Sequence, residues 1–144
     1  MKLTFNFEHE TINQLRAKMA KYDHIVVYTD GASRGNPGSA GSGAAFFGED
    51  SKGSLDFICG ARISLGHHSN NFAEYTAVIM AQLILAYLEK RVITINTDSK
   101  ILVRQVKGLY AVKNVRLVYT VPIVHDLILH FNYVALNYVP REQN

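Results

Sequence analysis

The chain has 144 residues, 48% of them hydrophobic, which predicts a single domain with one proper core. Fifteen Lys and Arg against 12 Asp and Glu leave a net charge of +3, which permits a polyanionic partner without requiring one. No apolar run reaches the roughly 18 residues of a membrane span, and residues 1–23 lack the hydrophobic centre of a signal peptide. The single cysteine, Cys59, excludes an internal disulfide and favours a reducing, intracellular compartment. We expect the cytoplasm, although the sequence does not distinguish it from the nucleus or an organelle.

The N-terminal region differs in pattern from the rest of the chain. Residues 11–21 place Ile12, Leu15 and Met19 at spacings of three and four, which predicts a short amphipathic helix. We interpret residues 1–22 as an N-terminal extension with this helix, and residues 23–144 as the main domain.

Strand patterns dominate the next part of the chain. Residues 24–30 hold a β-branched run that ends at an Asp-Gly pair, which predicts a buried central strand. Residues 31–43 are rich in Gly, Ser, Asn and Pro and predict a long turn, followed by a second strand at 44–48. From Leu55 to Ile63 apolar residues alternate strictly, which predicts a third strand with one buried face.

Helical and strand patterns alternate in the second half. The expected elements are helices at 71–90, 99–107 and 115–131, and strands at 92–97 and 133–139. Pro122 lies inside the last helical pattern and predicts a kink or a break there. The order β-β-β-α-β-α-α-β predicts an α/β fold, with a five-stranded mixed sheet and helices on both faces.

Three acidic residues stand out against this framework. Asp30 and Asp98 come at the carboxyl ends of predicted strands, and Glu74 lies near the start of the longest predicted helix. Ligands in such sheets lie beyond the carboxyl ends of the strands. If the fold brings the three carboxylates together, they cannot all ionise without a cation between them. Hard divalent cations bound in this way, beside a basic surface, point to phosphodiester chemistry.

Each acid also has a simple structural interpretation. Asp30 fits a turn residue because Asp-Gly is a common turn pair. Glu74 fits a capping box with Asn71, and Asp98 fits an N-cap. The local sequence around the acids helps to weigh these alternatives.

Four segments resemble the motifs of the ribonuclease H family, in the family's order. They are residues 29–38, 69–75, 97–99 and 138–144. The resemblance implies the ribonuclease H-like fold and an endonuclease that cleaves the RNA strand of RNA–DNA hybrids. It also implies two Mg²⁺ ions, with Mn²⁺ as a substitute; in the family's terms Asp30 bridges both ions, and Glu74 and Asp98 complete the coordination of one of them.

The resemblance also suggests how the hybrid is held. Ser33, Asn36, Asn70 and Asn71 match positions that touch the minor groove, where hydroxyls and amides read 2′-hydroxyls. Their simpler interpretation, turn and cap chemistry, is compatible with this role. Independently, Lys100, Arg104 and Lys107 form a positive stripe at helical spacing after Asp98, which is either a solvated face or a seat for phosphates.

The chain departs from the family at its C-terminal end. The family's fourth acid, an Asp, would lie four residues beyond Asn144, and the final helix that carries it is missing too. Glu142 is the nearest acid, but it precedes the expected position. We therefore interpret the domain as C-terminally incomplete. The alternative function is a catalytically weakened nucleic-acid-binding module, or a domain of a larger assembly.

Overall fold

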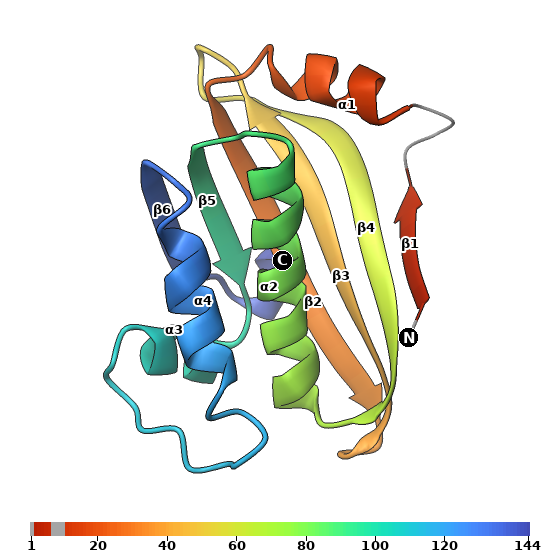
Figure 1. Cartoon of the computed structure of the whole chain (residues 1–144), viewed down its shortest axis with the longest axis vertical. Coiled ribbons are helices and arrows are strands. Elements are labelled where there is room, and N and C mark those ends of the chain that lie inside the picture. Colours follow the sequence, from red (N-terminus) through yellow and green to blue (C-terminus); the bar gives the residue numbers. More distant parts are fainter. Residues whose placement is uncertain (1, 7–10) are drawn as a thin grey trace.

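A mixed β-sheet crosses the molecule, and the chain adds helices to it in the order shown in Figure 1. The computed structural model describes residues 2–6 and 11–144. The strands are β1 Lys2–Asn6, β2 His24–Arg34, β3 Gly38–Glu49, β4 Leu55–His68, β5 Val92–Thr97 and β6 Tyr133–Tyr138. The helices are α1 Ile12–Met19, α2 Asn70–Tyr87, α3 Lys100–Val106 and α4 Thr120–Ile128, followed by the 3₁₀-helix η1 Arg141–Gln143.

The strand order is β1-β4-β3-β2-β5-β6. β1, β4, β3 and β2 pair antiparallel in succession, whereas β5 pairs parallel with β2 and β6 parallel with β5. All five predicted strands are present, and β1 adds a sixth at the edge beside β4. Sequence analysis assigned no strand to residues 2–6, because a short edge strand is specified mainly by its partner, which is distant along the chain.

The long turn predicted at 31–43 is wrong. β2 runs on to Arg34 and β3 begins at Gly38, so the two strands meet in a tight hairpin that contains the cis Asn36–Pro37 peptide. Some of the glycines serve close packing instead of a turn. A Cβ on Gly31 would lie 2.2 Å from the carbonyl carbon of Ala73 in α2, so only glycine allows this approach.

The strict alternation predicted for the third strand also fails at its start. Leu55 and Phe57 are 40% and 52% exposed, whereas Cys59 and Ala61 are buried. A register shift between β3 and β4 at Phe46–Phe47 changes which side chains face the helices. The strand therefore has a buried face over only part of its length.

Pro122 marks a break and not a kink. The helix predicted at 115–131 begins at Thr120, which makes Pro122 the third helical residue. The first backbone N–H groups of a helix have no intrahelical partner, so proline is tolerated there. The residues between 115 and 119 form turns.

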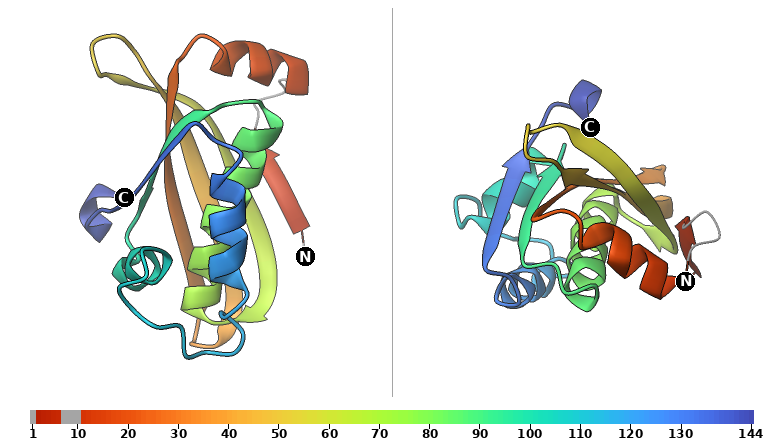
Figure 2. Two further views of the ribbon diagram at one scale, coloured as in Figure 1. Left: turned by 60° about the vertical axis from the view of Figure 1, so that its left-hand side comes forward. Right: turned by 90° about the horizontal axis from the view of Figure 1, so that it is seen from above.

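The α-helices gather on one face of the sheet (Figure 2). α2 packs against β2 and β3, α4 packs on α2, and α3 contacts both α2 and α4. On the opposite face the described residues place the short 3₁₀-helix η1 (Figure 2). Within the described residues, no helix combines the length and the apolar character that crossing a bilayer needs.

The helix of the N-terminal extension shares the main core. Leu15 and Met19 of α1 are fully buried. Lys90 donates hydrogen bonds to the carbonyl oxygens of Met19 (3.2 Å) and Tyr22 (2.5 Å) and so holds the chain that follows α1. Burial lowers the pKa of the Lys90 ammonium group.

Candidate metal and nucleic-acid site

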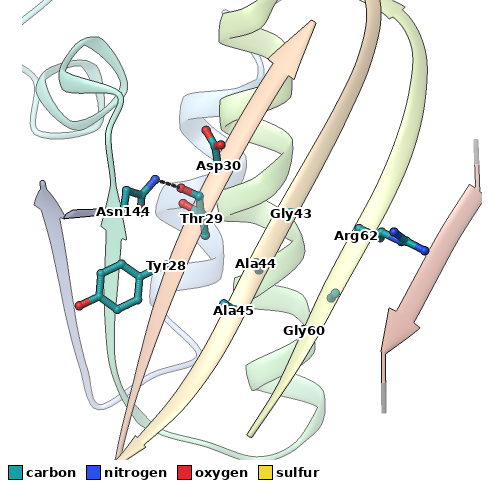
Figure 3. A pocket seen from close by; sticks show the side chains of 10 residues that line it. Tyr28, Thr29, Asp30, Gly43, Ala44, Ala45, Gly60, Arg62 and Asn144 are labelled. Carbon is teal, nitrogen blue, oxygen red and sulfur yellow. Dashed lines mark hydrogen bonds between the residues drawn. The ribbon is translucent and has the colours of Figure 1, made fainter. Parts of the chain in front are cut away.

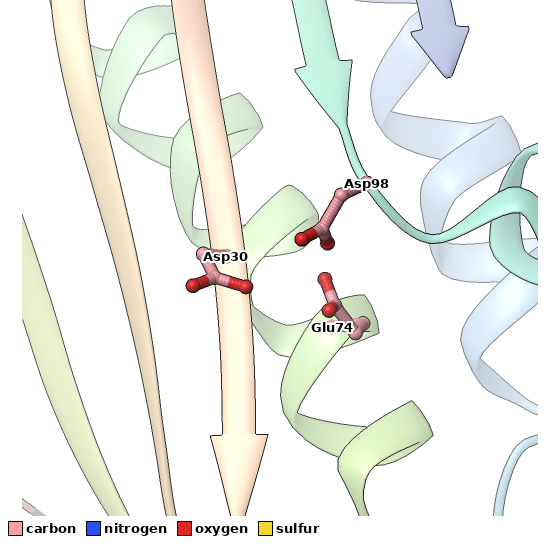
Figure 4. A group of neighbouring side chains, drawn as sticks. All are labelled: Asp30, Glu74 and Asp98. Carbon is pink, nitrogen blue, oxygen red and sulfur yellow. The ribbon is translucent and has the colours of Figure 1, made fainter. Parts of the chain in front are cut away.

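Three carboxylates from distant parts of the chain meet at the carboxyl end of β5, beside the interior of β2 (Figure 4). Asp30 projects from β2, Glu74 from the start of α2, and Asp98 from the segment directly after β5. One oxygen of each carboxylate lies within 4.8 Å of the others. The structure therefore brings together the three acids that sequence analysis singled out.

The pairing of the strands explains this convergence. β2 and β5 are parallel neighbours, and Thr29 is the register partner of Thr97. Asp30 and Asp98 directly follow these two threonines, so both acids lie at the same level of the sheet, where β5 ends. β5 ends at Thr97 while β2 continues to Arg34, which leaves space beyond the end of β5.

The simple structural interpretations of the acids do not hold. Ser69 is the N-cap of α2 and accepts from the Phe72 N–H, so Glu74 forms no capping box with Asn71. Ser99 caps α3 in the same way, which leaves Asp98 free of that role. Asp30 lies within β2, paired with β3, and not in a turn.

Glu74 is the most constrained of the three acids. It is only 9% exposed, and its Oε2 is buried without a hydrogen-bond partner. Burial, followed by the charges of Asp98 and Asp30, raises the pKa of Glu74 to about 8. An orphaned buried carboxylate oxygen of this kind calls for a cation as its partner.

Asp30 is affected in the same direction. Although the residue is exposed, partial burial of its carboxyl group and the charge of Asp98 raise the Asp30 pKa. The backbone N–H of Gly31 and the charge of Arg141 act in the opposite direction. A divalent cation would relieve the repulsion among these acids. The all-oxygen donor set and the unpartnered Glu74 oxygen fit a hard ion such as Mg²⁺.

A polar network borders the acids at the β2–β3 hairpin. The backbone N–H and the hydroxyl of Ser33 donate to the Asn70 side-chain oxygen at 2.8 and 3.0 Å. The backbone N–H of Asn70 donates to the Asn36 side-chain oxygen at 3.0 Å. Asn71, the next residue of α2, is exposed. Three of the four predicted groove-contacting residues are therefore linked to one another, and they join the hairpin to the start of α2.

Of the three predicted cations, Lys100 and Arg104 lie on α3, directly after Asp98, and Lys107 is the C-cap of this helix. The Lys100 ammonium group is 5.9 Å from the centre of the Tyr138 ring. The Arg104 guanidinium lies 5.1 Å from the Tyr110 ring centre and donates to the Tyr110 hydroxyl. Lys100 is exposed and Arg104 is half-buried, so aromatic contacts orient both positive groups at the surface.

Sequence analysis missed Arg62 and Asn144. Hollows of about 600 and 510 Å³ flank Asp30 on the open face of the sheet, and Arg62 lines both of them (Figure 3). Gly43 is the register partner of both Asp30 and Arg62, and it carries no side chain. Asn144 lines the larger hollow and donates to the Thr29 carbonyl oxygen at 2.9 Å. Only the strand register shows that Arg62 and Asp30 lie on either side of the same residue of β3.

Comparisons with known proteins agree with this architecture. The family model described as "Reverse transcriptase-like" matches residues 28–144. The bifunctional protein Rv2228c of Mycobacterium tuberculosis is 32% identical over 120 residues, which are 83% of this chain and 32% of that protein. Ribonuclease HI of Halobacterium salinarum is 30% identical over 120 residues, 83% of this chain and 58% of that protein. The chain thus spans about a third of the length of the mycobacterial relative.

Solved structures give the same result. The structure of RNase H1 from Halobacterium salinarum NRC-1 matches with a TM-score of 0.77 at 28% identity, covering 83% of this chain and 88% of that one. The LC11-RNase H1 structure, a complex with an RNA/DNA hybrid, matches with a TM-score of 0.72 at 32% identity and the same coverage. The chain belongs to the ribonuclease H-like family, and the predicted fold class, a mixed sheet with helices, is confirmed.

Proposed function

We propose that this chain is a ribonuclease H that hydrolyses the RNA strand of RNA–DNA hybrids with Mg²⁺, or with Mn²⁺ in its place. The observation that carries the proposal is the convergence of Asp30, Glu74 and Asp98 beside an open surface. The LC11-RNase H1 complex with an RNA/DNA hybrid supports the choice of substrate, since that protein matches 83% of this chain.

In this proposal the three acids share the work of holding cations. A bound divalent cation would activate a water molecule and stabilise the leaving oxygen of the scissile phosphodiester. Asp30 is exposed, so its carboxylate lies on the side of the site that the substrate would approach. Glu74 is buried, and its carboxylate comes from α2. Asp98 completes the set from the end of β5. Because these groups repel one another, they favour the cation over the empty state.

We further propose that two sets of polar residues position the hybrid. Ser33, Asn36, Asn70 and Asn71 would meet the minor groove, where the amide and hydroxyl groups distinguish 2′-hydroxyls from deoxyribose. The bonds among them use the side-chain oxygens of Asn36 and Asn70, so their amide nitrogens are the donors for the substrate. Lys100 and Arg104 would contact phosphates, which position a duplex without reading its sequence.

The organisation of the chain fits this activity. We propose that residues 23–144 form the nuclease unit and that residues 1–22 are an extension that packs on it. The buried Leu15 and Met19 of α1 support this arrangement. We place the activity in a reducing compartment, the cytoplasm in the simplest case, because the chain has a single cysteine, Cys59, and therefore no internal disulfide framework.

The test is cleavage of a hybrid that carries separate labels on its RNA and DNA strands. The chain should cut the RNA strand alone, in Mg²⁺ or Mn²⁺, and chelation should stop the reaction. Asp30→Asn should abolish cleavage. Asp126→Asn, which changes an exposed acid on α4, should not. Equal cleavage by Asp30→Asn would exclude the metal mechanism. Tight hybrid binding with no cleavage by the wild type would instead favour the alternative, a nucleic-acid-binding module.

A further inference from the structure

Two contacts act on the peptide group that joins Ala73 to Glu74. The Ser42 hydroxyl, from β3, donates to the Ala73 carbonyl oxygen at 2.6 Å. On β2, a Cβ at Gly31 would lie 2.4 Å from that same oxygen and 2.4 Å from the Glu74 nitrogen. Ser42 is 4% exposed and Ala73 is fully buried, so water does not compete for this bond. The two strands thus set how closely α2 approaches the sheet at the Ala73–Glu74 peptide.

The Ser42 bond differs from the Ser69 and Thr76 contacts, and unlike the bonds of Ser33 and Asn36 to Asn70 it acts on the peptide that carries Glu74. Ser69 holds the helix through its own N-terminal turn, as an N-cap does. Thr76 donates to the Phe72 carbonyl at 2.8 Å, which is also a contact within α2. Ser42 instead joins α2 to the sheet, next to the strand that carries Asp30. It is therefore placed to fix the position of Glu74 relative to the other two acids.

We propose that Ser42 is a positioning residue for the metal ligand Glu74, and this inference rests on the proposed nuclease function. It acts through the Ala73–Glu74 peptide and contacts neither the cation nor the hybrid. Without the Ser42 hydroxyl, the Ala73 carbonyl of α2 loses this hydrogen bond to β3. The Glu74 carboxylate is then no longer held at a fixed distance from Asp30. Such outer contacts commonly change metal affinity by about 10- to 100-fold when removed.

The choice of ion separates positioning from simple stability. Mg²⁺ demands near-ideal octahedral geometry, whereas Ca²⁺ accepts flexible coordination. A displaced Glu74 should therefore weaken Mg²⁺ binding more than Ca²⁺ binding. A general loss of folding stability has no reason to discriminate between the two ions.

The experiment is calorimetric titration of the full chain with Mg²⁺ and, separately, with Ca²⁺. Ser42→Ala should bind Mg²⁺ about 10-fold more weakly than wild type, at the lower end of the range for outer contacts, with a smaller loss for Ca²⁺. Ser42→Thr, which keeps the hydroxyl, should restore most of the Mg²⁺ affinity. Thr76→Ala is the matched control, because it removes a hydroxyl bonded to a carbonyl of the same helix, and it should bind both ions as the wild type does. In hybrid cleavage, Ser42→Ala should lower kcat and leave KM unchanged, since Ser42 faces the helix and not the substrate.

The outcomes separate this inference from the proposed function. A wild-type chain that binds no divalent cation overturns both. A wild-type chain that binds Mg²⁺ with the same affinity as Ser42→Ala overturns only the role of Ser42. So does an equal loss for Mg²⁺ and Ca²⁺, or an equal loss in Ser42→Ala and Thr76→Ala. If Ser42→Ala lacks the wild-type circular dichroism spectrum, Ser42→Cys supplies the test. Its thiol is a weaker donor, so its Mg²⁺ affinity should fall between those of Ser42→Thr and a chain without the donor.

Discussion

Two polar clusters lie along strand β2, and they differ in how their charges are satisfied. At the amino end, the His24 imidazole contacts the Glu49 carboxylate through Nδ1 and the Thr94 hydroxyl through Nε2 at 2.7 Å. This group joins β3, β2 and β5. Farther along β2, Asp30 meets Glu74 and Asp98, so that three like charges lie together, and one buried oxygen of Glu74 has no hydrogen-bond partner.

The difference shows that one strand carries a cluster that stabilises the fold and another that is suited to binding a cation. The His24 cluster finds its partners inside the chain, so its groups contribute to folding. In the acid cluster the repulsion among the carboxylates outweighs the charge of Arg141, so the cluster opposes folding until a cation binds. A substitution in one cluster should consequently change stability, and a substitution in the other should change metal binding and catalysis.

The largest expected effect is on catalysis. Asp98→Asn should reduce hybrid cleavage by about 1,000-fold, because metal-assisted charge stabilisation supplies several kcal/mol to such reactions. Its free energy of unfolding without metal should be equal to or higher than that of wild type, since one like charge is gone. Single-turnover cleavage and urea unfolding in a chelator measure the two quantities. A variant that cleaves normally would remove Asp98 from the site.

The pH dependence of stability should distinguish the acid cluster next. The folded chain raises the Glu74 pKa from 4.5 to about 8, so between these values the native state holds a proton that the unfolded state releases. The Glu74 contribution to the free energy of unfolding therefore falls as pH rises, by about 3 kcal/mol between roughly pH 5.5 and 8.

Urea unfolding in a chelator at several pH values measures this slope. Glu74→Gln should lack the Glu74 contribution, and saturating Mg²⁺ should reduce it in the wild type, because the cation stabilises the ionised form. If Glu74→Gln left the dependence of stability on pH unchanged, the pKa of the Glu74 carboxyl would not be raised in the folded chain.

A substitution in the His24 cluster should change stability and leave cleavage unchanged. His24→Ala removes contacts to Glu49 and Thr94 at a half-buried position and should lower the free energy of unfolding by about 1 to 2 kcal/mol. Cleavage per folded molecule should not change, because these residues lie away from the acids. Chemical denaturation and cleavage assays on the same sample test both statements. Lost cleavage with full stability would contradict the comparison.

The smallest effect is expected at Glu89, which follows α2 at the His24 end of the molecule. Glu89 adopts a left-handed backbone with φ of 62°, which is unfavourable for a residue with a side chain. Glu89→Gly should raise the free energy of unfolding by about 0.5 to 1 kcal/mol and leave cleavage unchanged. Glu89→Ala is the control, since it removes the carboxylate and keeps the strain. An equal gain in both variants would assign the effect to charge.

Much of the fold could be read from residue patterns along the chain. Apolar periodicity located the helices, and β-branched runs located the central strands, because these signals are local. The errors have non-local causes. Gly31 signalled a turn, but it accommodates α2. The alternation from Leu55 failed because a register shift within the β3–β4 pair, at Phe46–Phe47, changed which side of β4 faces the core.

The candidate site shows the same division. Residue types alone identified Asp30, Glu74 and Asp98 as candidates, and the motif resemblance supplied their family. Their convergence, however, depends on the parallel pairing of β2 with β5 and on the close approach of α2 to Gly31. The position of Arg62 opposite Asp30 across β3 and the contact of Ser42 with α2 also stayed hidden, because one depends on strand register and the other on a hydrogen bond between β3 and α2. Local sequence carries the chemistry of each side chain, whereas distances between segments far apart in the chain arise only when the sheet and its helices pack together.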